Sequence, residues 1–445
     1  LISGLIVALW GLPSHFGYDP TCFLFRGTFD VSCWTADFQP RARIFSTLGQ
    51  PAWLAAYLAI LIPITIALIL TISHNHRRPS IYLIYLALLI LLTLFYVDLL
   101  YTHSRSGFLG IWIALLFFFT VYIFTVIRGK KPFGLAQGGQ EIRKNLLLIP
   151  CLLLLITFII GTPIGQLNRF TLAGIESYFQ KIQAQKNLPA AEDKKAISQT
   201  PTPIQSSESG GTESGDIRLN VWKGAIEIWK NNPLFGTGVE TFAFAYYKYK
   251  PASQNLTSEW NFLYNKAHNE YLNYLATTGI VGLGTYLSMI FVFLWLCIKY
   301  CVSSIKQKIH NTNYLILNAA LVAGYISILI TNFFGFSVVI TNIYLLMIPA
   351  FVFVLAGMID YKKSEPKKNA VISYNISLFQ WAPIFFICLI GFFMLWALFR
   401  FWQADIAYAL GYNLDRAGEH QQAYPNLHKA VELRGDEPVF KDELS

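Results

Sequence analysis

The stretch that decides the fold is "YNKAHNEYLNYLATTGIVGLG", residues 264–284. It opens on polar side chains, among them His268, Asn269 and Glu270, and then becomes apolar enough to enter a bilayer. Polar groups at such a boundary can be simple anchors, or they can form a site that faces water on one side and lipid on the other. The composition and topology of the whole chain bear on this choice.

The composition indicates a membrane protein. Hydrophobic residues make up 54% of the 445 and charged residues only 13%, whereas soluble domains are roughly 45–50% apolar and about 25% charged. The expected fold is all-α, a polytopic membrane helix bundle over residues 1–399. Hydropathy predicts eight full spans: 51–73, 80–101, 106–127, 145–163, 273–298, 314–334, 338–359 and 376–399.

The first residues, LISGLIVALWGL, are too few to span a bilayer, which takes about 20 apolar residues. We interpret them as the end of a further helix whose start is missing. A signal peptide would need a basic region before the apolar run, and none precedes it. We therefore expect the chain to be a fragment.

Basic residues orient the spans. The four connections that hold Arg78, Lys131, Lys306 and Lys363 carry fourteen Lys and Arg against three Asp and Glu. By the positive-inside rule these connections are cytoplasmic. Four segments then lie outside the cytoplasm: 13–50, 102–105, 164–270 and the C-terminal tail. Orientation of the helices accounts for most of the net charge of +9, so no nucleic-acid partner is expected.

The outside segment 164–270 has two parts of opposite composition. Residues 180–215 are rich in Pro, Ser, Gly and Thr without any aromatic residue, which predicts a flexible insertion. Residues 216–270 are expected to form an ordered, catalytic lobe with eleven aromatic residues. Its first helix is predicted to be capped by Asp216 and to bury one apolar face: Ile217, Val221, Ile228 and Trp229.

Three smaller features of the sequence also lead to predictions. Cys22 and Cys33 share the first outside segment, where a disulfide is permitted but not required. Gly279 is expected to let helices approach closely. Residues 402–445 resemble one truncated tetratricopeptide-like unit, although an ordinary amphipathic helical hairpin would show similar spacing.

Charged residues at the outer boundary are the candidates for chemistry. Arg105 lies in a very short outside turn, Arg218 opens the helix that leads to Trp222, and His268 precedes a span. Arginine pairs bidentately with phosphate oxygens and stays charged, while histidine can accept a proton from a hydroxyl near neutral pH. Aromatic residues such as Trp222 are suited to stacking on sugars, although belt residues at this level are common.

These stretches also resemble a known family. "THSRSGFLG", "RLNVWKGAIEIWKNNPLFGTGVETF" and "KAHNEYLNYLATTGIVGLGTYL", together with the earlier "RIFSTLGQPAWLAAYLAILIP", resemble the O-antigen ligase and O-antigen polymerase superfamily. The resemblance covers roughly residues 40–360. It implies a GT-C-like bundle in the inner (plasma) membrane with its active site on the extracytoplasmic side.

The resemblance also implies an activity of cell-envelope polysaccharide biosynthesis. Members transfer a glycan from an undecaprenyl diphosphate carrier to an acceptor, without a cofactor or, in the ligases, a metal. It implies that Arg105 and Arg218 bind the donor diphosphate and that His268 assists acceptor attack. The implied substrate-binding residues are Arg41, Arg43, Trp222, Asn269, Glu270 and Tyr271.

Several alternatives remain open at this point. The acceptor can be a glycan, a lipid or a protein, and the tail can recruit a protein partner. A flippase or transporter of a lipid-linked glycan would use the same outside arginines, but it would need ionisable groups at mid-membrane depth, which are scarce here. A third alternative is a membrane scaffold whose tail is the active part.

Overall fold

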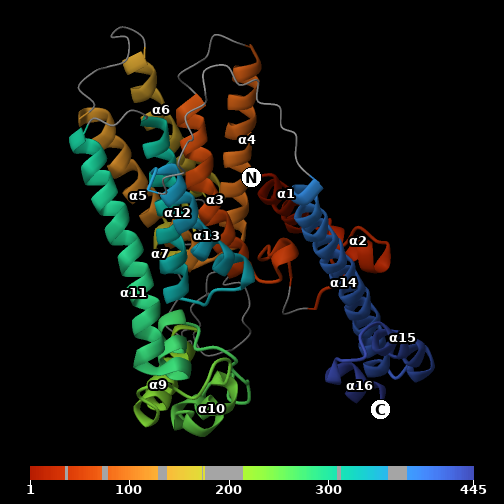
Figure 1. Cartoon of the computed structure of the whole chain (residues 1–445). Coiled ribbons are helices and arrows are strands. Elements are labelled where there is room, and N and C mark those ends of the chain that lie inside the picture. Colours follow the sequence, from red (N-terminus) through yellow and green to blue (C-terminus); the bar gives the residue numbers. More distant parts are fainter. Residues whose placement is uncertain are drawn as a thin grey trace, which may run out of the picture. The chain divides into compact units, whose positions relative to one another are not determined.

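The computed structural model describes the chain except for a few segments: 36–38, 73–78, 129–137, 173, 176–213, 308–311 and 359–377. Nearly all of the expected flexible insertion, 180–215, lies outside the described residues. The chain divides into two compact units, Leu1–Asp360 and Tyr361–Ser445. Every regular element within the described residues is a helix (Figure 1). The all-α fold class is therefore confirmed.

Six of the described helices are long and apolar enough to cross a membrane. They are α3 (Pro51–Ile72), α4 (Pro79–Tyr101), α5 (Arg105–Arg128), α11 (Glu270–Gln307), α12 (Thr312–Phe333) and α14 (Leu378–Arg416). The two other expected spans correspond to α6 (Gly138–Ile160) and α13 (Val339–Leu355), whose described apolar parts are shorter than 18 residues. The chain is a multi-pass membrane protein.

Helix α3 is the centre of the first unit. Its side chains are buried over almost its whole length between α4, α5 and α12. Small residues permit this close packing: a Cβ added to Gly107 on α5 would lie 2.4 Å from the Cβ of Ala55 on α3. Gly324 on α12 likewise lies against the backbone of Ile60. The outer ends of these helices are thereby held close together.

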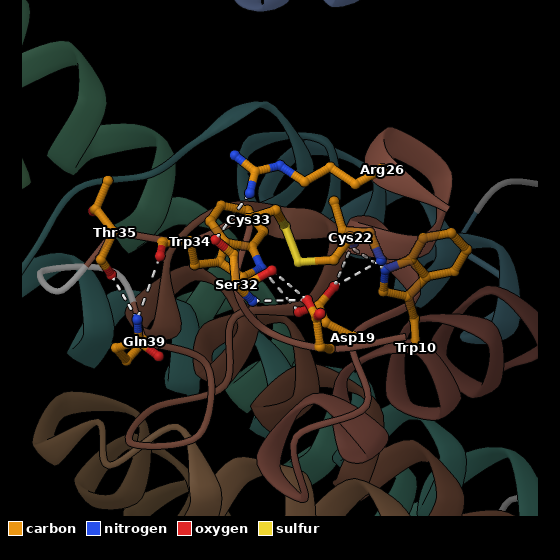
Figure 2. The surroundings of a disulfide bond; sticks show 11 residues. Trp10, Asp19, Cys22, Arg26, Ser32, Cys33, Trp34, Thr35 and Gln39 are labelled. Atoms are coloured by element: carbon orange, nitrogen blue, oxygen red, sulfur yellow. Dashed lines mark hydrogen bonds between the residues drawn. A yellow bond between two sulfur atoms is a disulfide. The ribbon is translucent and has the colours of Figure 1, made fainter. Parts of the chain in front are cut away.

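The first outside segment is fixed by a disulfide. Cys22, in α2 (Pro20–Arg26), is bonded to Cys33, with their Cα atoms 5.4 Å apart. The Asp19 carboxylate accepts hydrogen bonds from the backbone N–H of Cys22 and from Trp34 Nε1, so the same side chain caps α2 and ties it to the loop segment that holds Trp34 (Figure 2). The sequence permitted this disulfide without requiring it, and the structure contains it.

The outside lobe is built on three helical elements. They are α9 (Ser214–Asn231), α10 (Phe242–Tyr249) and the 3-10 helix η3 (Ala252–Leu256). The predicted apolar face of α9 is confirmed for Ile217, Val221 and Ile228, which are buried, while Trp229 is only half-buried. Asp216 does not precede α9 as expected but lies within its first turn, where its charge still favours the helix N-terminus.

The second unit consists of helices. The expected span 376–399 and the start of the tail form one continuous helix, α14, on which α15 (His420–Leu433) packs, followed by α16 (Pro438–Leu444). Gly411 on α14 allows this contact, because a Cβ there would lie 2.7 Å from Leu427. The helix pairing fits a hairpin, and the tetratricopeptide assignment stays a prediction.

Helix α11 is interrupted where the sequence predicted a regular span. Gly279 has φ 65° and ψ −166°, which is not helical. The rings of Tyr274 and Tyr286 stack with centroids 4.4 Å apart, although a straight helix would separate their Cα atoms by about 18 Å at 1.5 Å per residue. The chain therefore folds back at Gly279, and residues 270–278 lie against the start of the long helix that follows. Gly279 is a reversal point, beyond the close-packing role expected of it.

The reversal leaves backbone N–H and C=O groups near Gly279 without partners in the helix, and the segment after α9 supplies hydrogen bonds to them. Thr237 and Gly238 donate their N–H groups to the carbonyls of Ala276 and Thr277 (3.2 and 2.8 Å). In return, the N–H groups of Ile280 and Val281 bind the carbonyls of Pro233 and Leu234 (2.9 and 3.2 Å). These four hydrogen bonds define a junction, residues 233–238 with 276–281, that joins the end of α9 to α11.

A methyl group at Gly279 should break this junction. An added Cβ would lie 2.3 Å from the carbonyl carbon of Leu234, and the positive φ is itself unfavourable for alanine. We expect Gly279→Ala to destabilise the lobe by about 2 kcal/mol or more and to lower the apparent melting temperature in detergent. Gly284→Ala is the matched control, because nothing lies within 4 Å of its Cβ. Equal melting temperatures for the two variants would contradict the role of the junction.

Candidate active site

A cavity with a mixed polar and aromatic lining lies where the outer ends of the helices meet the lobe. Its empty volume is about 460 Å³, its open mouth included. Five helix ends and three loop segments supply its lining: Gln50, Ala52, Trp53, Ala56, Ser106, Arg218, His268, Thr331, Asn332, Phe334, Gly335, Phe336 and Thr341. A cation, a titratable imidazole, hydroxyls and two amides therefore surround one space beside aromatic rings.

Arg218 and His268 both line this cavity, although 50 positions separate them in the sequence. Arg218 lies in the first turns of α9, and His268 lies two residues before α11. The packing of α9 on α11 and the junction at Gly279 hold the two elements together. Two of the residues predicted from the sequence are thus neighbours in one cavity.

The backbone at His268 is held in an unusual conformation. Its φ of 51° lies in the left-handed region, which costs a non-glycine residue on the order of 1 kcal/mol. Two asparagines stabilise the turn: Asn269 Oδ1 accepts the N–H of Leu272 and caps α11, and Asn273 Oδ1 accepts the N–H of Ala267 (3.0 and 3.2 Å). The imidazole is thereby presented to the cavity by a rigid turn.

The charge state of His268 follows from its surroundings. Burial, and secondly the positive charge of Arg218, lower the pKa of His268 from its usual 6.5 to about 4. Its ring packs edge-on against Tyr264 and Phe336, with centroids 5.9 and 5.4 Å away. The imidazole of the unliganded protein is therefore neutral at physiological pH and can accept a hydrogen bond.

Glu270 and Tyr271, predicted to bind substrate, are outside the cavity lining and contact neighbouring helices instead. Glu270 is buried and accepts the N–H of Ser337 at 3.4 Å, and the Tyr271 hydroxyl donates to the carbonyl of Leu329 at 3.0 Å. The Ser337 hydroxyl in turn donates to Asn332 Oδ1 (2.9 Å). These contacts fix the loop between α12 and α13, which forms one wall of the cavity.

Trp222 and Asn269 also lie outside the lining. Trp222 is half-buried, and its ring packs against Phe333 at 5.9 Å. Its buried indole N–H has no hydrogen-bond partner within the described residues. Asn269 is buried and serves as the helix cap described above.

The remaining predicted arginines are not among the residues that line the cavity. Arg105 is the exposed first residue of α5, and its neighbour Ser106 reaches the lining. Arg41 and Arg43 are exposed. Arg43 Nε donates to the Thr102 carbonyl (3.1 Å), and its charge lowers the pKa of His103 after the larger effect of burial.

Sequence reasoning missed most of the membrane side of the cavity. Gln50 and Trp53 lie just before and at the start of α3. Asn332 lies at the end of α12, Phe336 in the connection that follows, and Thr341 in the first turn of α13. The only sequence feature that could have indicated these residues is that each lies at the outer end of an expected span. Among the described residues, no group of three or more His, Cys, Asp or Glu side chains could hold a metal ion.

Comparison with known families agrees with the resemblance seen in the sequence. Residues 89–287, which include Arg105, Arg218 and His268, match the family model described as O-antigen ligase. The resemblance to the O-antigen ligase family is confirmed over this range. No curated protein matches the chain. The O-antigen ligase match supports a membrane enzyme that transfers glycans, and it does not extend to the tail.

The electrostatic account of His268 can be tested by titration. Because Arg218 disfavours the protonated imidazole, Arg218→Gln should raise the pKa of His268 above about 4, but burial should keep it below 6.5. Histidine NMR in a detergent-solubilised sample would follow the titration directly. Lys223→Gln, on the exposed side of the same helix, should leave the pKa unchanged. An unchanged pKa in Arg218→Gln would show that the two side chains do not interact.

Proposed function

We propose that this protein transfers or polymerises a glycan from an undecaprenyl diphosphate carrier onto an acceptor hydroxyl. The observation that carries the proposal is the presence of Arg218 and His268 in one cavity at the outer ends of the helices, within a range that matches the O-antigen ligase family. The cavity would then lie on the extracytoplasmic side of the inner membrane, in line with the positive-inside rule.

In the proposed reaction the arginine stabilises the leaving group. The bond between the anomeric carbon and the diphosphate oxygen breaks, and negative charge develops on the carrier diphosphate. A guanidinium can pair with two phosphate oxygens at once, and it acts most strongly where water is excluded. Arg218 would fill this role from the cavity wall, and Arg105 from the adjacent start of α5.

His268 would act on the acceptor. Its neutral imidazole accepts the proton of the acceptor hydroxyl while the oxygen attacks the anomeric carbon, which inverts that centre in a single displacement. Burial and Arg218 make it a weak base in the unliganded protein. A bound diphosphate offsets the charge of Arg218, so donor binding raises the pKa of His268 and strengthens the base.

The other expected residues would act around this pair. Glu270, Tyr271 and Asn269 hold the turn and the cavity wall, and we propose that their substitution affects transfer through the position of His268. Arg41, Arg43 and Trp222 would contact substrate beyond the reaction centre. No metal is required, because the arginines neutralise the leaving group.

Transfer in vitro is the test of this proposal. The purified protein, in its full natural length, would be incubated with an undecaprenyl diphosphate-linked glycan and an acceptor, and products would be separated by size. Arg218→Ala and His268→Ala should each lower kcat/KM about 10²-fold or more. Lys223→Ala and His428→Ala, both exposed, are the controls and should transfer normally.

The sizes of the products also distinguish a polymerase from a ligase. A ladder of lengths indicates a polymerase, and a single addition indicates a ligase. Normal transfer by both Arg218→Ala and His268→Ala would contradict the proposal. Movement of the carrier across a vesicle membrane without any transfer would favour a flippase instead.

A further inference from the structure

A row of aromatic rings leads from the cavity to the surface of the lobe. Across the cavity, Trp53 contacts Phe336 and Phe336 contacts His268, with ring centroids 6.1 and 5.4 Å apart. From His268 the row continues to Tyr264 and Phe262 at 5.9 and 4.9 Å. Each ring meets the next edge-on or steeply inclined, so the row is one connected set of contacts.

The outer end of this row is open to solvent. Tyr264 is 3% exposed, whereas Phe262 is 55% exposed and Trp260, two residues earlier, is 57% exposed. Buried aromatic rings are explained by packing. Packing does not explain the two exposed rings: Phe262 is the outer end of the row that begins at the cavity, and Trp260, which makes no ring contact among the described residues, lies two residues away in the same loop.

The loop that carries these rings is held in place. The N–H of Trp260 binds the carbonyl of Thr257, and the N–H of Phe262 binds the carbonyl of Glu259 (3.2 and 3.1 Å). Lys250 donates to the Trp260 carbonyl, and the Tyr264 hydroxyl donates to the Glu259 carboxylate. The rings are therefore presented on an ordered backbone, so little conformational entropy is lost when they bind a ligand.

We infer that Phe262 and Trp260 form a carbohydrate-binding subsite for a glycan chain that extends from the cavity. Sugars present flat C–H faces that pack on aromatic rings, while their hydroxyls remain free for polar groups at the ring edges. Charged and amide groups border the loop, including Lys250, Glu259 and Asn261. The inference rests on the proposed function, because that function supplies a glycan in the cavity.

Continuity with the cavity argues for a glycan over other occupants. The exposed Phe244 lies on the same lobe but on a different element, α10, whereas Trp260 shares the loop of Phe262; neither Phe244 nor Trp260 makes a ring contact among the described residues. If the lobe only contacted the membrane surface, Phe244 would contribute to binding as much as Phe262 and Trp260. A subsite for a chain that leaves the cavity would depend on Phe262 and Trp260 alone. Phe244 is therefore the matched control.

The first experiment measures binding without catalysis. The probe is the free oligosaccharide released from the donor carrier, titrated calorimetrically against the full chain in neutral nanodiscs. Phe262→Ala and Trp260→Ala should each raise Kd roughly fivefold, while Phe262→Tyr and Phe244→Ala should match the wild type. Wild-type melting temperatures for all variants would exclude unfolding as the cause.

Three results would overturn the inference. They are an unchanged Kd in both alanine variants, no binding of the oligosaccharide by the wild type, and weaker vesicle binding of the variants with unchanged oligosaccharide binding. The binding measurement does not require glycan transfer. The subsite can therefore be supported even if the proposed reaction is disproved, and the reaction can be supported even if the subsite is disproved. A rise in KM only for long donor glycans would assign the subsite to the donor, and a rise only for long acceptors would assign it to the acceptor.

Discussion

The backbone junction at Gly279 is the constraint on which the candidate site depends. Four hydrogen bonds join residues 233–238 to the two sides of the helix reversal. They fix the end of α9 against α11, and the packing between these helices then holds Arg218 beside His268. A broken helix would otherwise leave unpaired backbone groups, which are costly at the edge of a membrane. The upstream loop and the reversal therefore stabilise each other.

The electrostatics of the cavity connect the two side chains further. A guanidinium beside a neutral, half-buried histidine is suited to binding an anion. In the proposed reaction that anion is the carrier diphosphate, whose charge would be shared between Arg218 and the helix N-terminus near His268. Binding of the donor and activation of the base would then be one event.

Much of the architecture could be predicted from the sequence because lipid imposes simple rules. Apolar length identifies spans, and the bias of Lys and Arg orients them. Arg218 and His268 could be singled out because charged groups are rare at such boundaries. Trp53, Asn332 and Phe336 could not, since they are ordinary residues whose convergence depends on how α3, α12 and α13 pack. The Gly279 reversal could not be predicted because "TTGIVG" also suits a continuous membrane helix, and its hydrogen-bond partners lie roughly 40 to 50 positions upstream.

The central claim is that Arg218 and His268 act together in one site. A double-variant cycle on kcat/KM for glycan transfer tests it most directly, with the two single alanine variants and the double variant measured under the same conditions. Residues that act as a unit show strongly non-additive losses. The account predicts that the double variant transfers about as slowly as the slower single variant. Losses that multiply would show that the two side chains act independently and would contradict the account.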